Sequence, residues 1–203
     1  YGLLSEIWGS TTINLNKGYV FQIFGGGEQG VIGKSLESID TSEDGNYQAP
    51  ADSSEFNGLH YQYNPAYSCY VNLKGTVSGI SKKEKNISDD MADCEFIYGG
   101  GFFGPIVGNT YVNLGSGRIF NSFAGSCNAD ILGHTETYIG RMIKDAYQET
   151  MRSHVDEESA YVSGFPWIRD YTYGGNDLGG RIMGEKNFVG RVRDDVKGMV
   201  HKA

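Results

Sequence analysis

The sequence contains few cysteines, and their arrangement limits what they can do. Three cysteines, Cys69, Cys94 and Cys127, lie far apart among 203 residues and form no Cys-x-x-Cys pair. Such a sparse, odd number excludes a framework held together by several disulfides. One disulfide bridge remains open, while a buried free thiol is the simplest reading of Cys127, which lies inside a repeated segment.

Long apolar runs and basic clusters are also missing. No apolar run reaches the roughly 18 residues that a membrane span needs, and no signal-peptide pattern follows Tyr1. The net charge of −8 and the pI near 5.0 argue against nucleic acid and anionic membranes, because both attract basic patches. Since the chain begins partway into a repeat and without Met, we expect it to be a piece of a longer protein.

Recognisable catalytic, cofactor and metal motifs are absent as well. The histidines show no His-x-His or His-x-x-x-His spacing, and no nucleophile-elbow or zinc-protease motif occurs. Gly33-Lys34-Ser35 resembles the end of a phosphate-binding loop, but Glu28 stands where that loop needs its leading glycine. Asp177 sits in a stretch with a distant likeness to calcium-binding repeats, yet no aspartate follows it nine residues later. We therefore expect no cofactor and no metal.

Glycine is what the sequence has in excess, and the glycines mark four copies of one pattern. There are 30 glycines, roughly twice the usual share of about 7%. Each copy runs from an aromatic residue through a glycine cluster to an apolar pair closed by glycine. The copies span Phe24–Lys34, Tyr98–Asn109, Phe123–His134 and Tyr173–Glu185. Such repetition indicates an architecture of stacked units before any residue is assigned a role.

Short segments with strand chemistry surround the glycine clusters. Residues 11–15 and 110–114 are rich in β-branched and apolar side chains, and Tyr70–Leu73 reads as a third copy of them. Segments that alternate between two faces follow at 19–24 and 118–123. If equivalent residues stack, an aromatic ladder forms inside the coil. Its predicted members are Phe24, Tyr98, Phe123 and Tyr173.

These features predict an all-β fold, a single parallel β-solenoid over residues 1–203, expected to be a right-handed β-helix. Three loop insertions leave the predicted coil, at about 36–68, 81–93 and 136–158. In the last one, apolar residues recur at three- and four-residue steps from Ile139 to Met151. That spacing predicts one amphipathic helix, docked on the coil by its apolar side.

The first insertion supplies the candidate binding residues, which are Tyr61, Tyr63 and Tyr67. Tyrosine rings stack on sugars and anchor protein interfaces, so a binding site is one hypothesis. The alternative is that these rings only pin the insertion onto the coil. No catalytic residue is assigned. A polysaccharide-cleaving site assembled from neighbouring repeats would draw on Arg118, Asp130, Asp177 and Arg181. Surface solvation is the simpler explanation for these four residues.

The repeats that begin at Phe24, Tyr98 and Tyr173 resemble those of very large surface proteins of Bacteroidetes and other gut bacteria. The shared pattern is an aromatic residue, several glycines, an apolar pair with Gly-Asn-Thr, and an alternating Val-Asn-Leu strand. The resemblance covers the repeated half of the chain and implies an extracellular, cell-surface, adhesin-like protein. It carries over no catalytic residue, since fold does not fix activity.

From the repeats and this resemblance we expect a non-catalytic bacterial adhesin-like or structural repeat protein. Its expected partners are glycans or host or bacterial surface proteins, bound through the insertions. The alternative function is that of a polysaccharide-active enzyme, a lyase or glycoside hydrolase, built on a β-helix.

Overall fold

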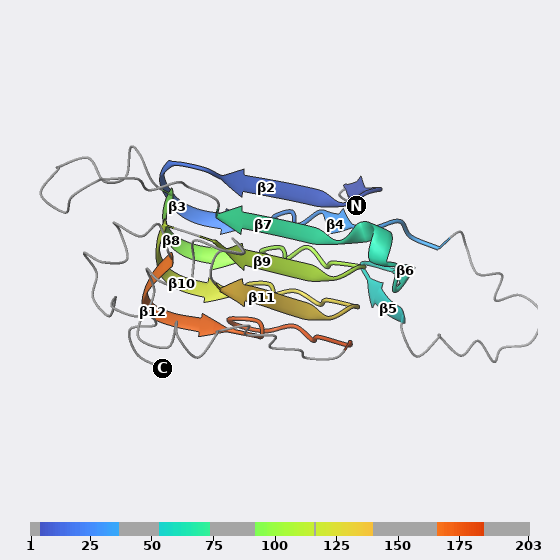
Figure 1. Cartoon of the computed structure of the whole chain (residues 1–203). Helices are drawn as coiled ribbons and strands as arrows, with labels where there is room; N and C mark the ends of the chain where they lie inside the picture. Colours follow the sequence, from blue (N-terminus) through green and yellow to red (C-terminus); the bar gives the residue numbers. More distant parts are fainter. Residues whose placement is uncertain (1–4, 37–52, 74–91, 116, 140–165, 185–203) are drawn as a thin grey trace, which may run out of the picture.

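The computed structural model describes residues 5–36, 53–73, 92–115, 117–139 and 166–184, and these are mostly β-strands in parallel sheets. Figure 1 shows strands from distant parts of the sequence lying side by side in two stacked layers. The all-β class with parallel pairing is therefore as the repeats predicted.

The first sheet has four strands in the order β11-β9-β7-β2. They are β2 (Thr11–Leu15), β7 (Cys69–Leu73), β9 (Thr110–Leu114) and β11 (Thr135–Ile139). All pairs are parallel and in register, so that Ile13, Val71, Val112 and Thr137 lie in one row across the sheet. The three strands predicted from β-branched composition are confirmed, because the β-branched side chains fit a half-buried pleated surface.

The second sheet also has four parallel strands, in the order β12-β10-β8-β3. They are β3 (Gly18–Phe24), β8 (Ala92–Tyr98), β10 (Gly117–Phe123) and β12 (Pro166–Tyr173). The register shifts between Ile119 and Asn121. A shift of this kind inserts an extra residue and interrupts the strict alternation of the two faces.

A third row of backbone pairing is formed by the apolar pairs of the repeats. The short strand β1 (Glu6–Ile7) pairs in parallel with β4 (Val31–Ile32). Single parallel bridges then continue from Ile32 to Ile106, from Ile106 to Ile131 and from Ile131 to Ile182. Each predicted copy of the repeat thus contributes one isoleucine to this row.

The predicted insertions differ from expectation where the structure describes them. The first contains an antiparallel hairpin, β5 (Ser53–Phe56) and β6 (Leu59–Gln62), and a short 3₁₀ turn η1 (Pro65–Tyr67). The hairpin turns at Asn57 and Gly58, both with positive φ. Of the second insertion, residues 92 and 93 belong to β8, and the remainder lies outside the described residues.

The amphipathic helix predicted for 136–158 is wrong at its start. Residues 136–139 are part of strand β11, which pairs in register with β9. The pairing partner prevails here over the helical spacing of the apolar side chains, because a local pattern is only a weak preference. The rest of that segment lies outside the described residues.

The main core lies between the two sheets. Its members come from the inward-facing positions of both, and each of them is at most 7% exposed. They are Ile23, Val71, Leu73, Ala92, Cys94, Ile97, Val112, Leu114, Ile119, Ile139 and Ile168. Because strand side chains alternate between faces, the residues between these positions point outward.

The predicted aromatic ladder is confirmed, but its position differs from the prediction. The ring centroids of Phe24 and Tyr98 are 4.7 Å apart, those of Tyr98 and Phe123 5.1 Å, and those of Phe123 and Tyr173 4.9 Å, each pair stacked. Ile23 belongs to the main core, whereas the adjacent Phe24 packs with a separate cluster around Tyr98, Phe123 and Cys127. The ladder therefore lies on the outer face of the second sheet, not inside the main core.

The glycine corners bring backbone segments of successive copies into direct contact. The N–H of Gly99 donates to Phe123 O at 2.9 Å, and the N–H of Gly25 donates to Tyr98 O at 2.9 Å. A Cβ atom at Gly99 would overlap the carbonyl oxygen of Ala124. Only glycine allows the two backbones to approach this closely.

Replacing Gly99 by Ala should therefore lower the free energy of unfolding by about 1–3 kcal/mol, as overpacking typically does. The matched control is Gly175→Ala at the last copy, where an added Cβ meets nothing within 4 Å, and its effect should stay within about 0.5 kcal/mol. Urea denaturation followed by circular dichroism measures both changes. Equal stability of the two variants would contradict the close-approach explanation.

A second stability prediction concerns Thr137, which occupies the valine position of its row and is fully buried. Its Oγ1 atom has no hydrogen-bond partner among the described residues. Thr137→Val should raise the free energy of unfolding by about 1 kcal/mol, because it removes an unsatisfied buried hydroxyl. The reverse change in the same row, Val112→Thr, should lower it by a similar amount or more. The same denaturation experiment measures both, and a loss of stability in Thr137→Val would show that the hydroxyl has a partner.

Candidate functional site

The outer face of the first sheet carries two rows of polar and aromatic side chains. In β2, β7, β9 and β11 these side chains alternate with the members of the main core, so they point away from it. One row consists of Thr12, Tyr70, Tyr111 and Glu136, and the other of Asn14, Asn72, Asn113 and Tyr138. These eight positions are a flat surface whose residues are fixed by strand register.

The asparagine row is a chain of side-chain hydrogen bonds. Asn113 Nδ2 donates to Asn72 Oδ1 at 2.6 Å, and Asn72 Nδ2 donates to Asn14 Oδ1 at 3.1 Å. Since parallel in-register strands place identical amides next to each other, each amide can both donate and accept. This row stabilises the stacking of β2, β7 and β9.

The neighbouring row begins with a pair of stacked tyrosines. The centroids of Tyr70 and Tyr111 are 4.8 Å apart with an angle of 8° between the rings. The Tyr111 hydroxyl accepts a hydrogen bond from Asn109 Nδ2 at 3.1 Å and lies 3.4 Å from His134 Nε2. Burial, together with the charge of Glu136, raises the pKa of Tyr111, although the bond from Asn109 lowers it. The hydroxyl is therefore protonated at neutral pH.

A histidine and a carboxylate complete this group. His134 Nε2 lies 3.1 Å from Glu136 Oε1, and the hydroxyl of Tyr138 donates to Glu136 Oε2. The side chains of His134 and Glu136 are 28% and 17% exposed, so both reach the surface. We call Tyr70, Tyr111, His134, Glu136 and Tyr138 the tyrosine–histidine cluster. Its ring faces, hydroxyls and carboxylate suit a ligand that carries many hydroxyl groups.

The structure places the three predicted binding tyrosines in different surroundings. Tyr61 is 1% exposed, packs against Val31, Val107 and Leu132, and donates from its hydroxyl to Glu6 Oε1 at 2.9 Å. Burial raises the pKa of Tyr61, and the bond to Glu6 raises it further. Tyr61 thus holds the β5–β6 hairpin on the sheets and offers no free surface to a ligand.

Tyr67 and Tyr63 are half-buried, and one of them borders the cluster. Tyr67 packs against the isoleucine row at Ile32 and Ile106. A Cβ atom at Gly133 would lie 2.7 Å from Tyr63 Cε2, so Tyr63 lies beside the segment that carries His134 and Glu136. Its role in binding stays a prediction.

Sequence reasoning did not select Tyr111, His134 or Glu136. The 25-residue spacing of the repeat would have found two of them. Thr135 pairs with Thr110, 25 residues earlier, and Glu136 pairs with Tyr111 at the same spacing. In the sequence, Tyr111 and Glu136 occupy the same strand position of two copies, one position after the repeat threonine. A register alignment of the copies therefore places them side by side.

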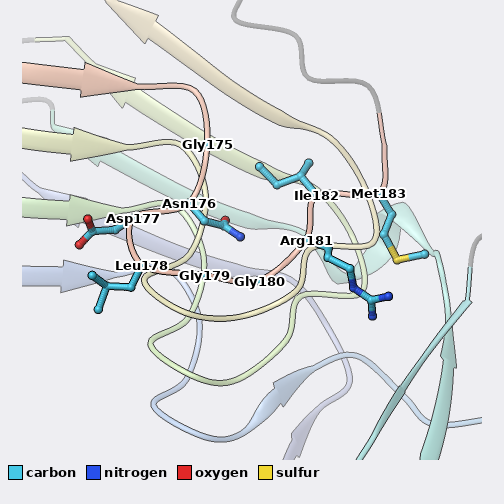
Figure 2. A pocket seen from close by; sticks show the side chains of 9 residues that line it. All are labelled: Gly175, Asn176, Asp177, Leu178, Gly179, Gly180, Arg181, Ile182 and Met183. Atoms are coloured by element: carbon cyan, nitrogen blue, oxygen red, sulfur yellow. The ribbon is translucent and has the colours of Figure 1, made fainter.

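The charged residues considered for catalysis are not assembled into one site. Arg118 makes a two-point ion pair with Asp93 on the second sheet. Asp177 and Arg181 both line a hollow formed by the segment from Gly175 to Met183. Figure 2 shows their side chains on opposite sides of the view, pointing away from each other.

The Asp130 carboxylate forms hydrogen bonds and an ion pair with Arg181. Its Oδ1 accepts from the Arg181 backbone N–H at 2.8 Å, and its Oδ2 accepts from Arg181 Nε at 3.1 Å and Nη2 at 2.6 Å. Burial pushes the pKa of Asp130 upward, but the hydrogen bonds and charge of Arg181 outweigh it, so the pKa is lowered. A carboxyl group that remains ionised does not act as a general acid near neutral pH.

The three cysteines are buried and unbridged. Burial raises the pKa of the Cys69 thiol to about 12 and that of the Cys94 thiol to about 12. Because the thiolate is the reactive form, these residues are poor nucleophiles and poor metal ligands. Within the described ranges, no three His, Cys, Asp or Glu side chains are grouped to hold a metal ion.

Comparison with known proteins gives no relatives. No family model matches the chain, no curated protein matches it, and no solved structure matches its fold. In the part of the chain that the structure describes, no helix has the length and apolar character needed to cross a bilayer.

The Asp130–Arg181 pair predicts a specific pH dependence. Because the pKa of Asp130 is lowered below 3.8 in the folded protein, the pair stabilises the fold above that pH and loses its effect as pH falls through the folded pKa. Arg181 is 67% exposed, so the contribution at pH 7 should not exceed about 1 kcal/mol. Thermal melts of wild type and Asp130→Asn between pH 7 and pH 2.5 should converge below pH 3.8. A constant difference would assign the stabilisation to packing.

Proposed function

We propose that this chain is part of a β-solenoid in a non-catalytic, adhesin-like protein of a bacterial cell surface, and that it binds glycan. The pairing pattern supports the solenoid part of the proposal. From Thr110 the chain passes through β9, β10 and the bridge at Ile131, and then returns as β11 beside β9. One such turn takes 25 residues, the separation of Thr110 and its partner Thr135. Stacked turns bury a common core that no single repeat buries alone.

The tyrosine–histidine cluster is the observation that carries the binding function. Ring faces, phenol hydroxyls, an imidazole and a carboxylate lie together on a rigid sheet at the surface. Glycan recognition needs these groups, because sugar rings present C–H bonds to aromatic faces and hydroxyls to polar atoms. Tyr63, directly after the β5–β6 hairpin, lies at the border of the cluster and would extend the surface with a residue of the first insertion. Glycan is favoured over a protein partner, because the cluster contains no aliphatic side chain.

A polysaccharide-active enzyme is the second candidate, and the contact of His134 with Glu136 favours it. A histidine oriented by a carboxylate is a common general base. Against this function, glycoside hydrolysis ordinarily uses two carboxyl groups that flank the bond, and the cluster contains only Glu136. The hydrogen bonds within the cluster also occupy both oxygens of Glu136.

Affinity electrophoresis through native gels that contain single polysaccharides tests the binding function. We expect at least one polysaccharide to retard the wild-type protein without being shortened. Tyr70→Ala should weaken that retardation about tenfold, because it removes a ring face worth about 1 kcal/mol or more. Thr12→Ala, at the next position of the same row, is the matched control and should bind as wild type does.

Three outcomes would count against the proposal. Free migration in every gel would remove the glycan-binding function. Shortening of the polysaccharide, lost in Glu136→Gln, would identify an enzyme instead. Equal weakening by Thr12→Ala and Tyr70→Ala would show that the ligand binds elsewhere.

A further inference from the structure

The outer face of the second sheet carries a group of exposed and half-buried aromatic side chains. Tyr19 is 52% exposed, Phe21 56%, and Tyr171 41%. Phe96 and Phe120 lie between them on β8 and β10, half-buried. We call these five residues the aromatic platform. Monomeric proteins seldom leave large apolar side chains grouped on one face unless the face binds something.

The rings of the platform are in contact across the strands. The centroids of Phe21 and Phe96 are 5.7 Å apart at 71°, and those of Phe96 and Phe120 are 6.3 Å apart at 64°. The Arg169 guanidinium carbon lies 5.4 Å from the centroid of Phe120. Phe21, Phe96 and Phe120 therefore form one continuous group of rings across β3, β8 and β10, and Tyr171 of β12 lies in the register row of Phe96 and Asn121. Strand pairing fixes the backbone beneath these rings, so ligand binding needs no ordering of the backbone.

A break in the two-residue alternation within each strand explains why so many rings of this sheet point outward. Val20 and Ile23 both contact the main core, although they are three residues apart. Phe21 and Gln22 both lie between these inward positions and are both exposed. The same spacing recurs in β10, where Ile119 is buried in the core and Ser122 is fully buried. Two consecutive residues of each of these strands therefore face outward, which enlarges the outer surface.

Side-chain chemistry indicates the class of ligand. The outward positions of β3, β8 and β10 include no aliphatic residue. They are Tyr19, Phe21, Gln22, Phe24, Asp93, Glu95, Phe96, Tyr98, Arg118, Phe120, Asn121 and Phe123. The amides of Gln22 and Asn121 alternate with Phe96 and Tyr171 along one row. Rings with interleaved amides match the alternating C–H faces and hydroxyl edges of a sugar chain.

We propose that the aromatic platform binds an extended, electrically neutral polysaccharide along the row of rings, an inference that rests on the proposed glycan-binding function. The C–H faces of successive sugar rings stack on the aromatic rings, and their hydroxyls bond to Gln22 and to Asn121 Nδ2, since Asn121 Oδ1 already accepts from the Tyr171 N–H at 3.1 Å. The preference for a neutral ligand follows from the charges on this sheet. Arg118 is paired with Asp93, and Arg169 over Phe120 is accompanied by Glu95 and Asp170 on the neighbouring strands. The sheet therefore offers no net positive charge to attract a polyanion.

The test uses the same native gels with one set of neutral polysaccharides (mixed-linkage β-glucan, xyloglucan, galactomannan) and one anionic set (polygalacturonate, alginate). Wild type should be retarded by at least one neutral polysaccharide and by neither anionic one. The double variant Phe21→Ala, Tyr171→Ala should weaken that retardation at least tenfold. Both side chains are exposed, so their removal leaves the core intact.

Two control variants separate binding from general effects. Phe103→Ala removes a ring that is 41% exposed, as Tyr171 is, but lies in a corner loop away from the platform, and its affinity should match wild type. Phe21→Tyr keeps a ring face at the edge of the platform, and its affinity should remain within about threefold of wild type. Thermal melts confirm that each variant is folded.

The outcomes distinguish this inference from the proposed function. If the double variant binds as wild type while Tyr70→Ala loses affinity, the platform is not the site, and the glycan-binding function stands. Retardation by anionic polysaccharides alone overturns the platform inference and leaves the function. Absence of retardation by any polysaccharide overturns both. Sedimentation measurements add one more outcome: a wild-type dimer that becomes a monomer in the double variant would identify a second copy of the chain as the occupant.

Discussion

Parallel, in-register pairing of successive repeat copies is the constraint on which the structure depends. Strands in a sheet lie about 4.8 Å apart, so each residue is held against its own counterpart in the next copy. Where the counterparts are aromatic, their rings stack at 4.7 to 5.1 Å. Where they are asparagines, each amide donates to the next. The same spacing leaves no room for a side chain at corners such as Gly99.

The threonine that recurs at the start of the strands in the first sheet also has a role in the stacking of the copies. Thr110 Oγ1 donates to Ala124 O at 2.5 Å, Thr11 Oγ1 donates to Gly25 O at 2.5 Å, and Thr135 Oγ1 donates to Gly174 O at 2.6 Å. Each threonine satisfies a carbonyl that the glycine corner leaves without a strand partner. The Gly-x-Thr part of the repeat thus joins the first strand of one copy to the corner that follows.

Much of the fold could be predicted from the sequence because the repeats encode it locally. Strands at 11–15 and 110–114 follow from β-branched composition, and the aromatic ladder follows from alignment of the copies. The face of the ladder could not be predicted, because the strands depart from the two-residue period on which that assignment depends: Val20 and Ile23 both contact the main core although they are three residues apart. The burial of Tyr61 could not be predicted either, because its hydrogen bond to Glu6 joins residues 55 positions apart in the sequence. The pairing of Thr135–Ile139 with β9 could not be predicted from the helical spacing of the apolar residues that begins at Ile139.

The candidate site was harder to predict than the fold, for a physical reason. Stacking selects residues that recur, and these are the ones that alignment of the copies finds. His134 and Glu136 do not recur: Asn109 and Tyr111 stand at their positions in the preceding copy. Identical copies would make the outer face of the sheet chemically uniform. Only residues that differ from the repeat, such as His134 and Glu136, give one part of that face a distinct set of side chains. The two outer faces illustrate this, since they share one core and strand spacing yet present a polar cluster on the first sheet and aromatic rings on the second. On this scaffold the outward-facing side chains, which the core does not constrain, are therefore free to differ in chemistry from one sheet to the other.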